Sequence, residues 1–313
     1  MPHIEQILEQ LHGKVLFTTL DIWDGYNNIR MQPEDQWKLA FKLPDGTYMP
    51  QVMFFGMTNA PAIFQRTMDQ IFVVLKNKYP GCIFVYMDDI LIVTPDDEEL
   101  HAEIVNVVLD MLATEDFFLK LSKCSFHQRT VDYLGIRIKG GIICIDPTKC
   151  NSLASWKEVL DDVHDVRSTL GLFRYNCPFI KGYAHIVQPV QQLTKKDVPF
   201  IWTPECTQAI RTLKAIVSSN PMLWRPDHNR PFELEVDASQ YTLGAILYQR
   251  NDGGKLQAVG YYLQILNPAE RNYNMYDWEL LAVIRALAHW RHLLLGAKHQ
   301  VVVWTDHNNL TFY

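Results

Sequence analysis

The stretch from Cys82 to Thr94 has the sequence CIFVYMDDILIVT, in which two aspartates separate two apolar runs. Runs rich in β-branched and aromatic residues on either side of a short polar pair are typical of two strands joined by a tight turn. Asp88 and Asp89 therefore lie where one predicted strand ends and the next begins. Carboxylates in such a place are costly to bury without water or a cation, so the turn is also a candidate site.

A third aspartate, Asp21, lies near the end of the apolar run Val15–Ile22, which predicts another strand. Hard carboxylate oxygens that converge at strand ends suit Mg²⁺, and two such ions about 4 Å apart stabilise the attacking and leaving oxygens of a phosphoryl displacement. We call Asp21, Asp88 and Asp89 the first acidic site. The alternative is that Asp88 and Asp89 only form a hairpin turn, for which Asp is a favoured residue.

The composition is that of a globular protein with two or three compact units, since 48% of the 313 residues are hydrophobic and 20% are charged. No apolar run is long enough for a membrane span and the start does not resemble a signal peptide, so we expect a soluble, intracellular chain without a membrane partner. The six scattered cysteines indicate reduced thiols, not a zinc site. The net charge of −6 is not typical of a nucleic-acid-binding protein, so the local distribution of charge matters more.

The chain divides into a mixed α+β stretch, a mainly helical stretch and a new α/β unit, with predicted domains at 1–140, 141–228 and 229–313. The first contains a predicted hairpin at Phe41–Met49 and a predicted helix at Asn59–Lys78. The second contains three predicted helices, at Cys150–Val159, Asp162–Ile180 and Cys206–Ser218. The third contains, in order, strands at Phe232–Asp237 and Gly244–Gln249, a helix at Asp277–Leu294 and a strand at Gln300–Thr305.

Three further acids lie in this last stretch, and we call them the second acidic site. Asp237 ends a predicted strand, Glu279 lies in the first turns of a predicted helix, and Asp306 follows the last predicted strand. Each has a structural alternative, because Asp237 is a plausible turn residue, Glu279 suits a helix N-terminus, and Asp306 is a plausible N-cap. The order of the three, with their flanking sequence, carries more information than any one of them.

Four motifs occur in order in the first stretch: LDIWDGYNNIR (Leu20–Arg30), FFGMTNAPAIFQ (Phe54–Gln65), YMDDILI (Tyr86–Ile92) and YLG (Tyr133–Gly135). Together they resemble the reverse transcriptases of Ty3/gypsy-class long-terminal-repeat retrotransposons. The resemblance implies the palm of a right-hand polymerase, in which the first acidic site binds catalytic Mg²⁺, with Mn²⁺ as a substitute. It also implies an RNA or DNA template–primer duplex and deoxynucleoside triphosphates as partners.

The same resemblance assigns four substrate-binding residues. Tyr26 would exclude a 2′-hydroxyl, Gly56 would let the backbone approach template or nucleotide, Gln65 would face the nascent base pair, and Lys120, or Lys123 nearby, would contact the leaving pyrophosphate. From the residues alone, Tyr26 is equally a core tyrosine, Gly56 a turn glycine, and the lysines solvated side chains.

The last stretch resembles the ribonuclease H domain of the same elements, through DASQYTLGAILYQ, NPAERNYNMYDWELLAVIRAL and TDHNNL. The resemblance implies that Asp237, Glu279 and Asp306 hold Mg²⁺ for cleavage of the RNA strand of an RNA–DNA hybrid. The helical stretch resembles the thumb, with phosphate contacts expected at Lys181, Lys195 and Lys196. The expected fold is therefore multidomain, α+β and α/β: palm, helical thumb or connector, and a ribonuclease H-like domain.

Some features depart from the family pattern. The chain begins twenty residues before Asp21, so a preceding fingers segment is expected to be absent, and it ends soon after Asp306, so a fourth carboxylate is expected to be missing. The rival interpretation is therefore an inactive relic, or a module that binds nucleic acid or protein without chemistry. The resemblance is compatible with a cytoplasmic particle or the nucleus as the location. No hydrolase G-x-S-x-G or P-loop motif is present.

Overall fold

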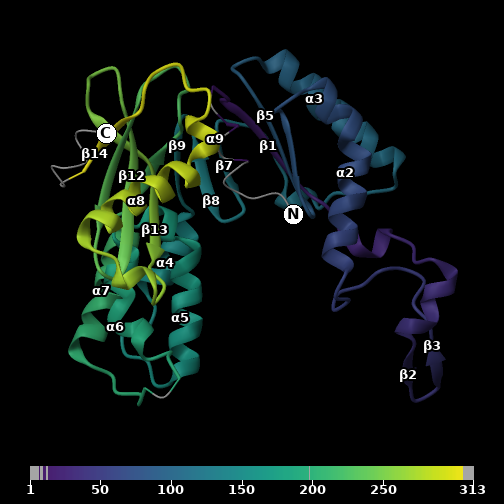
Figure 1. Cartoon of the computed structure of the whole chain (residues 1–313). Coiled ribbons are helices and arrows are strands. Elements are labelled where there is room, and N and C mark those ends of the chain that lie inside the picture. Colours follow the sequence, from purple (N-terminus) through teal and green to yellow (C-terminus); the bar gives the residue numbers. More distant parts are fainter. Residues whose placement is uncertain (1–6, 8–9, 12, 197, 306–313) are drawn as a thin grey trace. The chain divides into compact units, whose positions relative to one another are not determined.

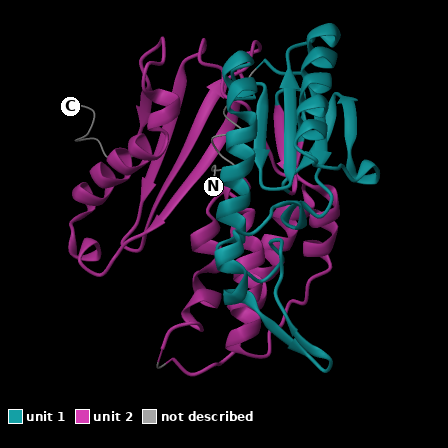
Figure 2. Ribbon diagram, turned by 90° about the vertical axis from the view of Figure 1, so that its right-hand side faces the viewer, with its two compact units in different colours: residues 1–134, 138–141 teal, residues 135–137, 142–313 magenta. Residues whose placement is uncertain are grey.

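The computed structural model describes residues 7, 10–11, 13–196 and 198–305. The chain forms two compact units (Figure 2). Unit 1 comprises Met1–Leu134 and Ile138–Gly141, and unit 2 comprises Gly135–Arg137 and Ile142–Tyr313. The stretches predicted as thumb and ribonuclease H-like domain both lie in unit 2, and their separation into two domains stays a prediction.

Unit 1 is built on an antiparallel sheet with the strand order β4-β5-β1-β6 (Figure 1). The strands are β1 (Leu16–Asp21), β4 (Ile83–Tyr86), β5 (Asp89–Thr94) and β6 (Ser125–Gln128). The predicted strand at Val15–Ile22 and the pair of strands in Cys82–Thr94 are thus confirmed. The central strands β1 and β5 are buried along almost their whole length. This burial agrees with the continuous apolar run from Ile90 to Val93 in β5.

Two helices pack on this sheet, α2 (Ala60–Lys78) and α3 (Glu98–Thr114). Phe64, Met68 and Phe72 of α2 join Ile90 and Ile92 of β5 in one core. The predicted helix at Asn59–Lys78 is confirmed, although the side chain of Asn59 makes no capping hydrogen bond. Acidic residues begin α3, and the Asp97 side chain caps it by accepting a hydrogen bond from the Leu100 amide at 2.9 Å.

The rest of unit 1 is made of short elements. The predicted hairpin at Phe41–Met49 is confirmed as β2 (Phe41–Leu43) and β3 (Gly46–Tyr48), which Figure 1 shows away from the sheet. Short 3-10 helices lie at Gly25–Asn28, Pro33–Leu39 and Leu121–Lys123. Strands β7 (Thr130–Tyr133), β8 (Ile136–Lys139) and β9 (Ile142–Ile145) follow at the boundary of the two units and were not predicted.

Unit 2 contains a sheet with the order β13-β12-β11-β14. Its strands are β11 (Phe232–Ala238), β12 (Thr242–Arg250), β13 (Leu256–Ile265) and β14 (Val302–Trp304); β10 (Met222–Trp224) pairs with β9. Strands β11 and β14 run parallel and the other pairs antiparallel. The predicted strands at Phe232–Asp237, Gly244–Gln249 and Gln300–Thr305 are confirmed, and β13 forms a hairpin with β12 around Asp252-Gly253-Gly254.

Helix α8 (Met275–His289) packs on the core formed by Phe232, Leu234 and Val236 of β11. The predicted helix Asp277–Leu294 is interrupted at Trp290, whose backbone leaves the helical region before α9 (Arg291–Leu294). The remaining helices are α4 (Pro147–Ala154), α5 (Val163–Tyr175), α6 (Tyr183–Gln192) and α7 (Pro204–Ser218), with 3-10 turns at Cys177–Phe179 and Glu270–Asn272.

Two of the predicted helices in this unit had wrong boundaries. The helix predicted at Cys150–Val159 begins at Pro147, because Asp146 caps it there by accepting from the Thr148 amide. It ends at Ala154. The helix predicted at Asp162–Ile180 ends at Tyr175, and α6 was not predicted. The mixed α/β multidomain fold class is nevertheless confirmed.

All six cysteines are free thiols, and within the described ranges no helix is long and apolar enough to cross a bilayer.

A buried histidine joins α3 to the sheet of unit 1. His101 is completely buried, and its two ring nitrogens lie 2.8 Å from the hydroxyl oxygens of Thr18 and Thr94. Burial, together with the neighbouring His127, lowers the pKa of His101 to about 4. The folded chain therefore holds this imidazole neutral, whereas an unfolded chain takes up the proton near pH 6.5.

We predict that unit 1 loses about 2 kcal/mol of unfolding free energy through His101 between pH 7 and pH 5. The sign follows from the lowered folded-state pKa, since protons bind first to the unfolded chain as the pH falls below 6.5. Urea unfolding, monitored by hydrogen exchange of the β1 and β5 peptides, measures the change. A His101→Gln variant should lose this contribution, whereas His164→Gln, which changes an exposed histidine of α5, should keep it; equal pH dependence in His101→Gln and the parent chain contradicts the assignment.

Candidate active sites

The strand register of unit 1 brings the first acidic site together. Asp21 of β1 lies directly opposite Asp89 of β5 in the antiparallel ladder. Just beyond this pair, the amide of Ile22 donates to the carbonyl of Asp88 at 2.9 Å. The three aspartates therefore meet at one end of adjacent strands, as the sequence predicted, and their positions are set by backbone hydrogen bonds.

The turn that carries Asp88 has a strained backbone. Met87 adopts a φ of 55°, which is unfavourable for a residue with a long side chain. Gln65 of α2 stabilises this conformation, because its Oε1 accepts from the Met87 amide at 2.8 Å and its Nε2 donates to the Val85 carbonyl at 3.1 Å. The Gln65 amide is thus buried and bonded to the turn, and its contact with the nascent base pair stays a prediction. The geometry therefore makes Gln65 a positioning residue for Asp88.

Negative charge accumulates at this site with little compensation. The pKa of Asp89 is raised to about 6, first by burial and then by the nearby Asp88 and Asp21. Among the described residues, Lys123 forms an ion pair with one of these acids, its Nζ lying 2.9 Å from Asp21 Oδ2. That ion pair raises the pKa of Lys123. A site where carboxylates repel one another has the electrostatic character that a bound cation relieves.

A cavity of about 230 Å³ opens beside these residues. Asp21 and Asp88 line it, together with Tyr26, Phe55, Lys120 and Lys123. Lys120 thus lies at the predicted place, its amide donating to the Asp21 carbonyl at 2.9 Å, while Lys123 makes the direct contact with the Asp21 carboxylate.

Tyr26 forms part of the cavity wall and is half-buried. Its ring forms T-shaped contacts with the rings of Phe55 and Phe64, with centroid-to-centroid distances of 4.9 and 5.4 Å, respectively. Burial and the charge of Asp88 raise the pKa of its hydroxyl. The two interpretations of Tyr26 are thus compatible in the structure, since one side of the ring packs on the core and the residue still borders the cavity.

Two glycines shape the same region. A Cβ on Gly25 would lie 2.7 Å from the Phe64 ring, so the close packing beside Tyr26 requires glycine. The sequence analysis missed this residue, although its place directly before Tyr26 in DGY was the available signal. Gly56 has a φ of +100°, and a Cβ added to it would meet no atom within 4 Å. Its backbone conformation, not crowding, therefore explains the glycine there.

The second acidic site is only partly described by the structure. Asp237 is exposed on β11, on the strand face that it shares with Glu235. Glu279 is completely buried on α8, and its Oε2 accepts a hydrogen bond from the hydroxyl of Thr305 at 3.2 Å. This bond brings the chain that follows β14 to the helix carrying Glu279. Asp306 lies outside the described residues.

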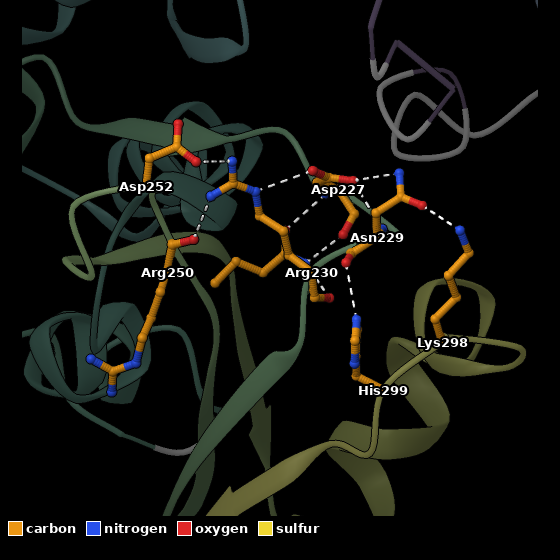
Figure 3. Close-up of polar contacts among 8 residues, drawn as sticks. Asp227, Asn229, Arg230, Arg250, Asp252, Lys298 and His299 are labelled. Atoms are coloured by element: carbon orange, nitrogen blue, oxygen red, sulfur yellow. Dashed lines mark hydrogen bonds and ion pairs between the residues drawn. The ribbon is translucent and has the colours of Figure 1, made fainter.

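A polar network fixes the start of β11 and the approach to β14 (Figure 3). Arg230 donates to Asp227, to Asp252 and to the Arg250 carbonyl, which connects the loop before β11 to the β12–β13 turn. Lys298 Nζ lies 2.6 Å from Asn229 Oδ1, which connects the same loop to the segment before β14. The sequence analysis missed this network, because its members are separated by up to 70 residues.

The three lysines predicted to contact phosphates, Lys181, Lys195 and Lys196, have different surroundings. Lys181 lies 4.0 Å from Glu235, at the limit of an ion pair. Lys195 and Lys196 follow the end of α6. Within the described part of the chain, no group of three or more His, Cys, Asp or Glu side chains is arranged to hold a metal ion.

The first and the last part of the chain each match a known protein family. Residues 1–138 match the family described as reverse transcriptase (RNA-dependent DNA polymerase), and residues 202–303 match the RNase H-like domain found in reverse transcriptase. The Tf2-3 transposon polyprotein of Schizosaccharomyces pombe is 37% identical over 312 residues, and the Tf2-7 polyprotein is 36% identical. The match covers 99% of this chain and 23% of each polyprotein, so the chain spans about a quarter of these relatives.

Solved structures show the same fold. The foamy viral protease-reverse transcriptase dRH in complex with double-stranded DNA aligns with a TM-score of 0.81 at 21% identity, covering 100% of this chain and 54% of that one. The foamy viral protease-reverse transcriptase in complex with RNA/DNA hybrid aligns with a TM-score of 0.78 at 22% identity, covering 98% and 41%.

We predict that Gln65→Ala frees the β4–β5 turn, because it removes the acceptor of the Met87 amide and the donor to the Val85 carbonyl. The local opening free energy should fall by about 2–3 kcal/mol, the cost of leaving buried backbone groups without partners. Hydrogen exchange of the peptide that spans residues 83–92 measures the change. Gln70→Ala, an exposed glutamine of the same helix, is the matched control, and equal exchange in the two variants contradicts the role assigned to Gln65.

Proposed function

Because the chain belongs to the reverse transcriptases of long-terminal-repeat retrotransposons, we propose that its first acidic site catalyses RNA-directed DNA synthesis. The observation that carries the proposal is the convergence of Asp21, Asp88 and Asp89 at the ends of β1 and β5. In the proposed reaction, the 3′-hydroxyl of a primer attacks the α-phosphorus of a deoxynucleoside triphosphate. A new phosphodiester bond forms, the bond to the β-phosphate breaks, and pyrophosphate leaves.

Mg²⁺ fits the donors that this site offers. Asp21 and Asp88 present hard carboxylate oxygens to the cavity, and burial, then the charges of Asp88 and Asp21, raise the pKa of the neighbouring Asp89. When bound, the metal supplies charge stabilisation at the attacking and leaving oxygens. Mn²⁺, with the same preference for oxygen ligands, is the expected substitute.

The chain's own residues have separate parts in this proposal. Asp21 and Asp88 would hold the metal, Asp89 would add negative charge beside them, and Gln65 would hold the turn that presents Asp88. Tyr26 would lie under the sugar of the incoming nucleotide, where its ring leaves no room for a 2′-hydroxyl. Lys120 and Lys123 would contact the phosphates of the leaving pyrophosphate, since both border the cavity.

We predict that Asp88→Asn lowers Mg²⁺-dependent primer extension on poly(rA)/oligo(dT) by at least a hundredfold, because it removes a charged metal ligand from the cavity. Asp88 is exposed, so the variant should fold normally. Asp110→Asn, which removes an exposed charge from α3, is the matched control and should extend primers at the parent rate. Extension by Asp88→Asn at the parent rate refutes the assignment, and no extension by the parent chain supports the relic or binding-module alternative.

For the second acidic site we propose hydrolysis of the RNA strand of an RNA–DNA hybrid, with Asp237, Glu279 and Asp306 as the metal-binding carboxylates. The observation that favours it is the Thr305–Glu279 hydrogen bond, which connects the end of the parallel strand β14 to α8. Water would attack a phosphorus of the RNA strand and the bond to the 3′ oxygen would break. This step needs a divalent ion that polarises the water.

We predict that Asp237→Asn abolishes Mg²⁺-dependent cleavage of an RNA–DNA hybrid while primer extension continues, because Asp237 belongs to unit 2 and the first acidic site to unit 1. Labelled-RNA cleavage assays measure the loss. Asp277→Asn, which changes a first-turn acid of α8, should retain cleavage. Cleavage of the same strength in Asp237→Asn and Asp277→Asn contradicts the proposed site.

A further inference from the structure

The loop between β13 and α8 carries a buried glutamate. We call residues 266–272 the Glu270 loop, because Glu270 is only 7% exposed and lies at its centre. The Asn267 amide donates to Glu270 Oε2 at 2.9 Å, and the Glu270 amide donates to Asn267 Oδ1 at 2.9 Å. This reciprocal pair is of the kind found in a capping box. It uses one carboxylate oxygen and leaves Oε1 for a second partner.

That second partner is an arginine of α8. Arg285 Nη2 donates to Glu270 Oε1 at 2.8 Å, and its Nη1 donates to Gln264 Oε1 at 3.1 Å. The Tyr262 hydroxyl donates to the same Gln264 oxygen at 2.6 Å. Because the carboxylate of Glu270 is buried, loss of either member of the ion pair leaves a poorly solvated charge, which is far more costly than loss of an exposed pair. The guanidinium therefore connects α8 firmly to the loop and to the end of β13.

A second contact connects the loop to the first turns of the same helix. The Trp278 indole Nε1 donates to the Glu270 carbonyl at 2.7 Å. Trp278 and Arg285 are seven residues apart, so they lie on one side of α8, two turns and about 10 Å apart along its axis. Two anchors on one side of a helix set both its rotation and its position along its axis. Glu279 directly follows the first anchor, so the loop determines where α8 places that buried carboxylate.

The other end of the Glu270 loop contacts the turn that follows Asp237. The Leu266 amide donates to the Tyr241 carbonyl at 2.9 Å. The Arg271 guanidinium lies over the Tyr241 ring, 5.5 Å from its centroid, while its Nε donates to the Leu266 carbonyl at 3.0 Å. Tyr241 belongs to the short connection between β11, which ends just after Asp237, and β12. One loop therefore connects the elements that carry Asp237 and Glu279.

We propose that Glu270 is a positioning residue for the second acidic site, which fixes Glu279 relative to Asp237 by holding α8 through Arg285. The inference rests on the proposed ribonuclease function of that site. Both carboxylate oxygens of Glu270 are taken by Arg285 and Asn267, so it acts through α8 and not on the metal or the RNA. Mg²⁺ tolerates little departure from octahedral geometry, so a small shift of α8 weakens the metal site.

The Mg²⁺ dependence of RNA–DNA hybrid cleavage tests this role. Glu270→Gln should raise the Mg²⁺ concentration for half-maximal cleavage about tenfold, the size of effect usual for residues that orient a metal ligand. The rate at saturating Mg²⁺ should change less, because excess metal fills the weakened site. Glu158→Gln, which removes another glutamate of unit 2 from ion pairs with Arg211 and Lys214, is the matched control and should keep the parent half-saturation.

Variants of Arg285 separate positioning from a loss of fold. Arg285→Met, which keeps an apolar stem without the charge, should raise the half-saturation as Glu270→Gln does. Arg285→Lys should recover most of the metal affinity, because an ammonium can still pair with Glu270. Mn²⁺ binding, measured by electron paramagnetic resonance in a chain with Asp21→Asn and Asp88→Asn, provides a readout that needs no turnover and should follow the same order.

Each outcome decides the proposal. Unchanged Mg²⁺ half-saturation and Mn²⁺ affinity in Glu270→Gln and Arg285→Met, with cleavage by the parent chain intact, overturn the positioning role and leave the ribonuclease function standing. Weakened metal binding that accompanies loss of the folded circular dichroism signal, without recovery in Arg285→Lys, marks a purely structural effect and also overturns it. A parent chain that cleaves no hybrid overturns the proposed function; Mn²⁺ affinity then decides the positioning role, and no Mn²⁺ binding overturns both.

Discussion

Repulsion among three carboxylates at the end of one β-ladder is the constraint on which the first unit depends. The antiparallel register places Asp21 against Asp89, and the turn between β4 and β5 brings Asp88 beside them. Burial and like charge raise the pKa of Asp89 to about 6, so holding these acids together is unfavourable in the absence of a cation. The surrounding contacts counteract that repulsion: Lys123 pairs with Asp21, and Gln65 holds the strained turn at Met87.

In the second unit, other kinds of contact position the acidic residues. Asp237 and Glu279 lie on separate elements, β11 and α8, and the loop of Asp227, Asn229 and Arg230 is bonded to the segment before β14. Thr305 accordingly reaches Glu279 on α8. Helix α6 is connected to the turn after Asp237 through His185, whose Nε2 lies 2.8 Å from the Thr242 hydroxyl. Positioning therefore comes as much from the helical stretch as from the sheet.

Patterns in the sequence predicted the strands and helices whose own residues form a clear apolar run or an apolar stripe. The apolar runs around Asp21 and Asp88-Asp89 gave buried strands, and Pro61 with the apolar stripe of residues 63–75 gave α2. Strands β6 to β9 were missed because each has only four residues, too few for a clear pattern, and α6 was missed because Pro189 lies inside it. Motif order predicted the acids of both sites. It did not predict Gln65 as a backbone clamp or Gly25 as a packing requirement, since both depend on contacts across long sequence separations.

If Asp21 and Asp88 form a divalent-cation site, Mn²⁺ binding measured by electron paramagnetic resonance depends on both carboxylates. The measurement uses the chain with Asp237→Asn, to remove the second acidic site, together with a template–primer duplex and a deoxynucleoside triphosphate. We expect that adding Asp21→Asn or Asp88→Asn weakens Mn²⁺ binding at least tenfold, whereas Asp110→Asn leaves it unchanged. Equal Mn²⁺ affinity in all these variants contradicts a metal site at the ends of β1 and β5.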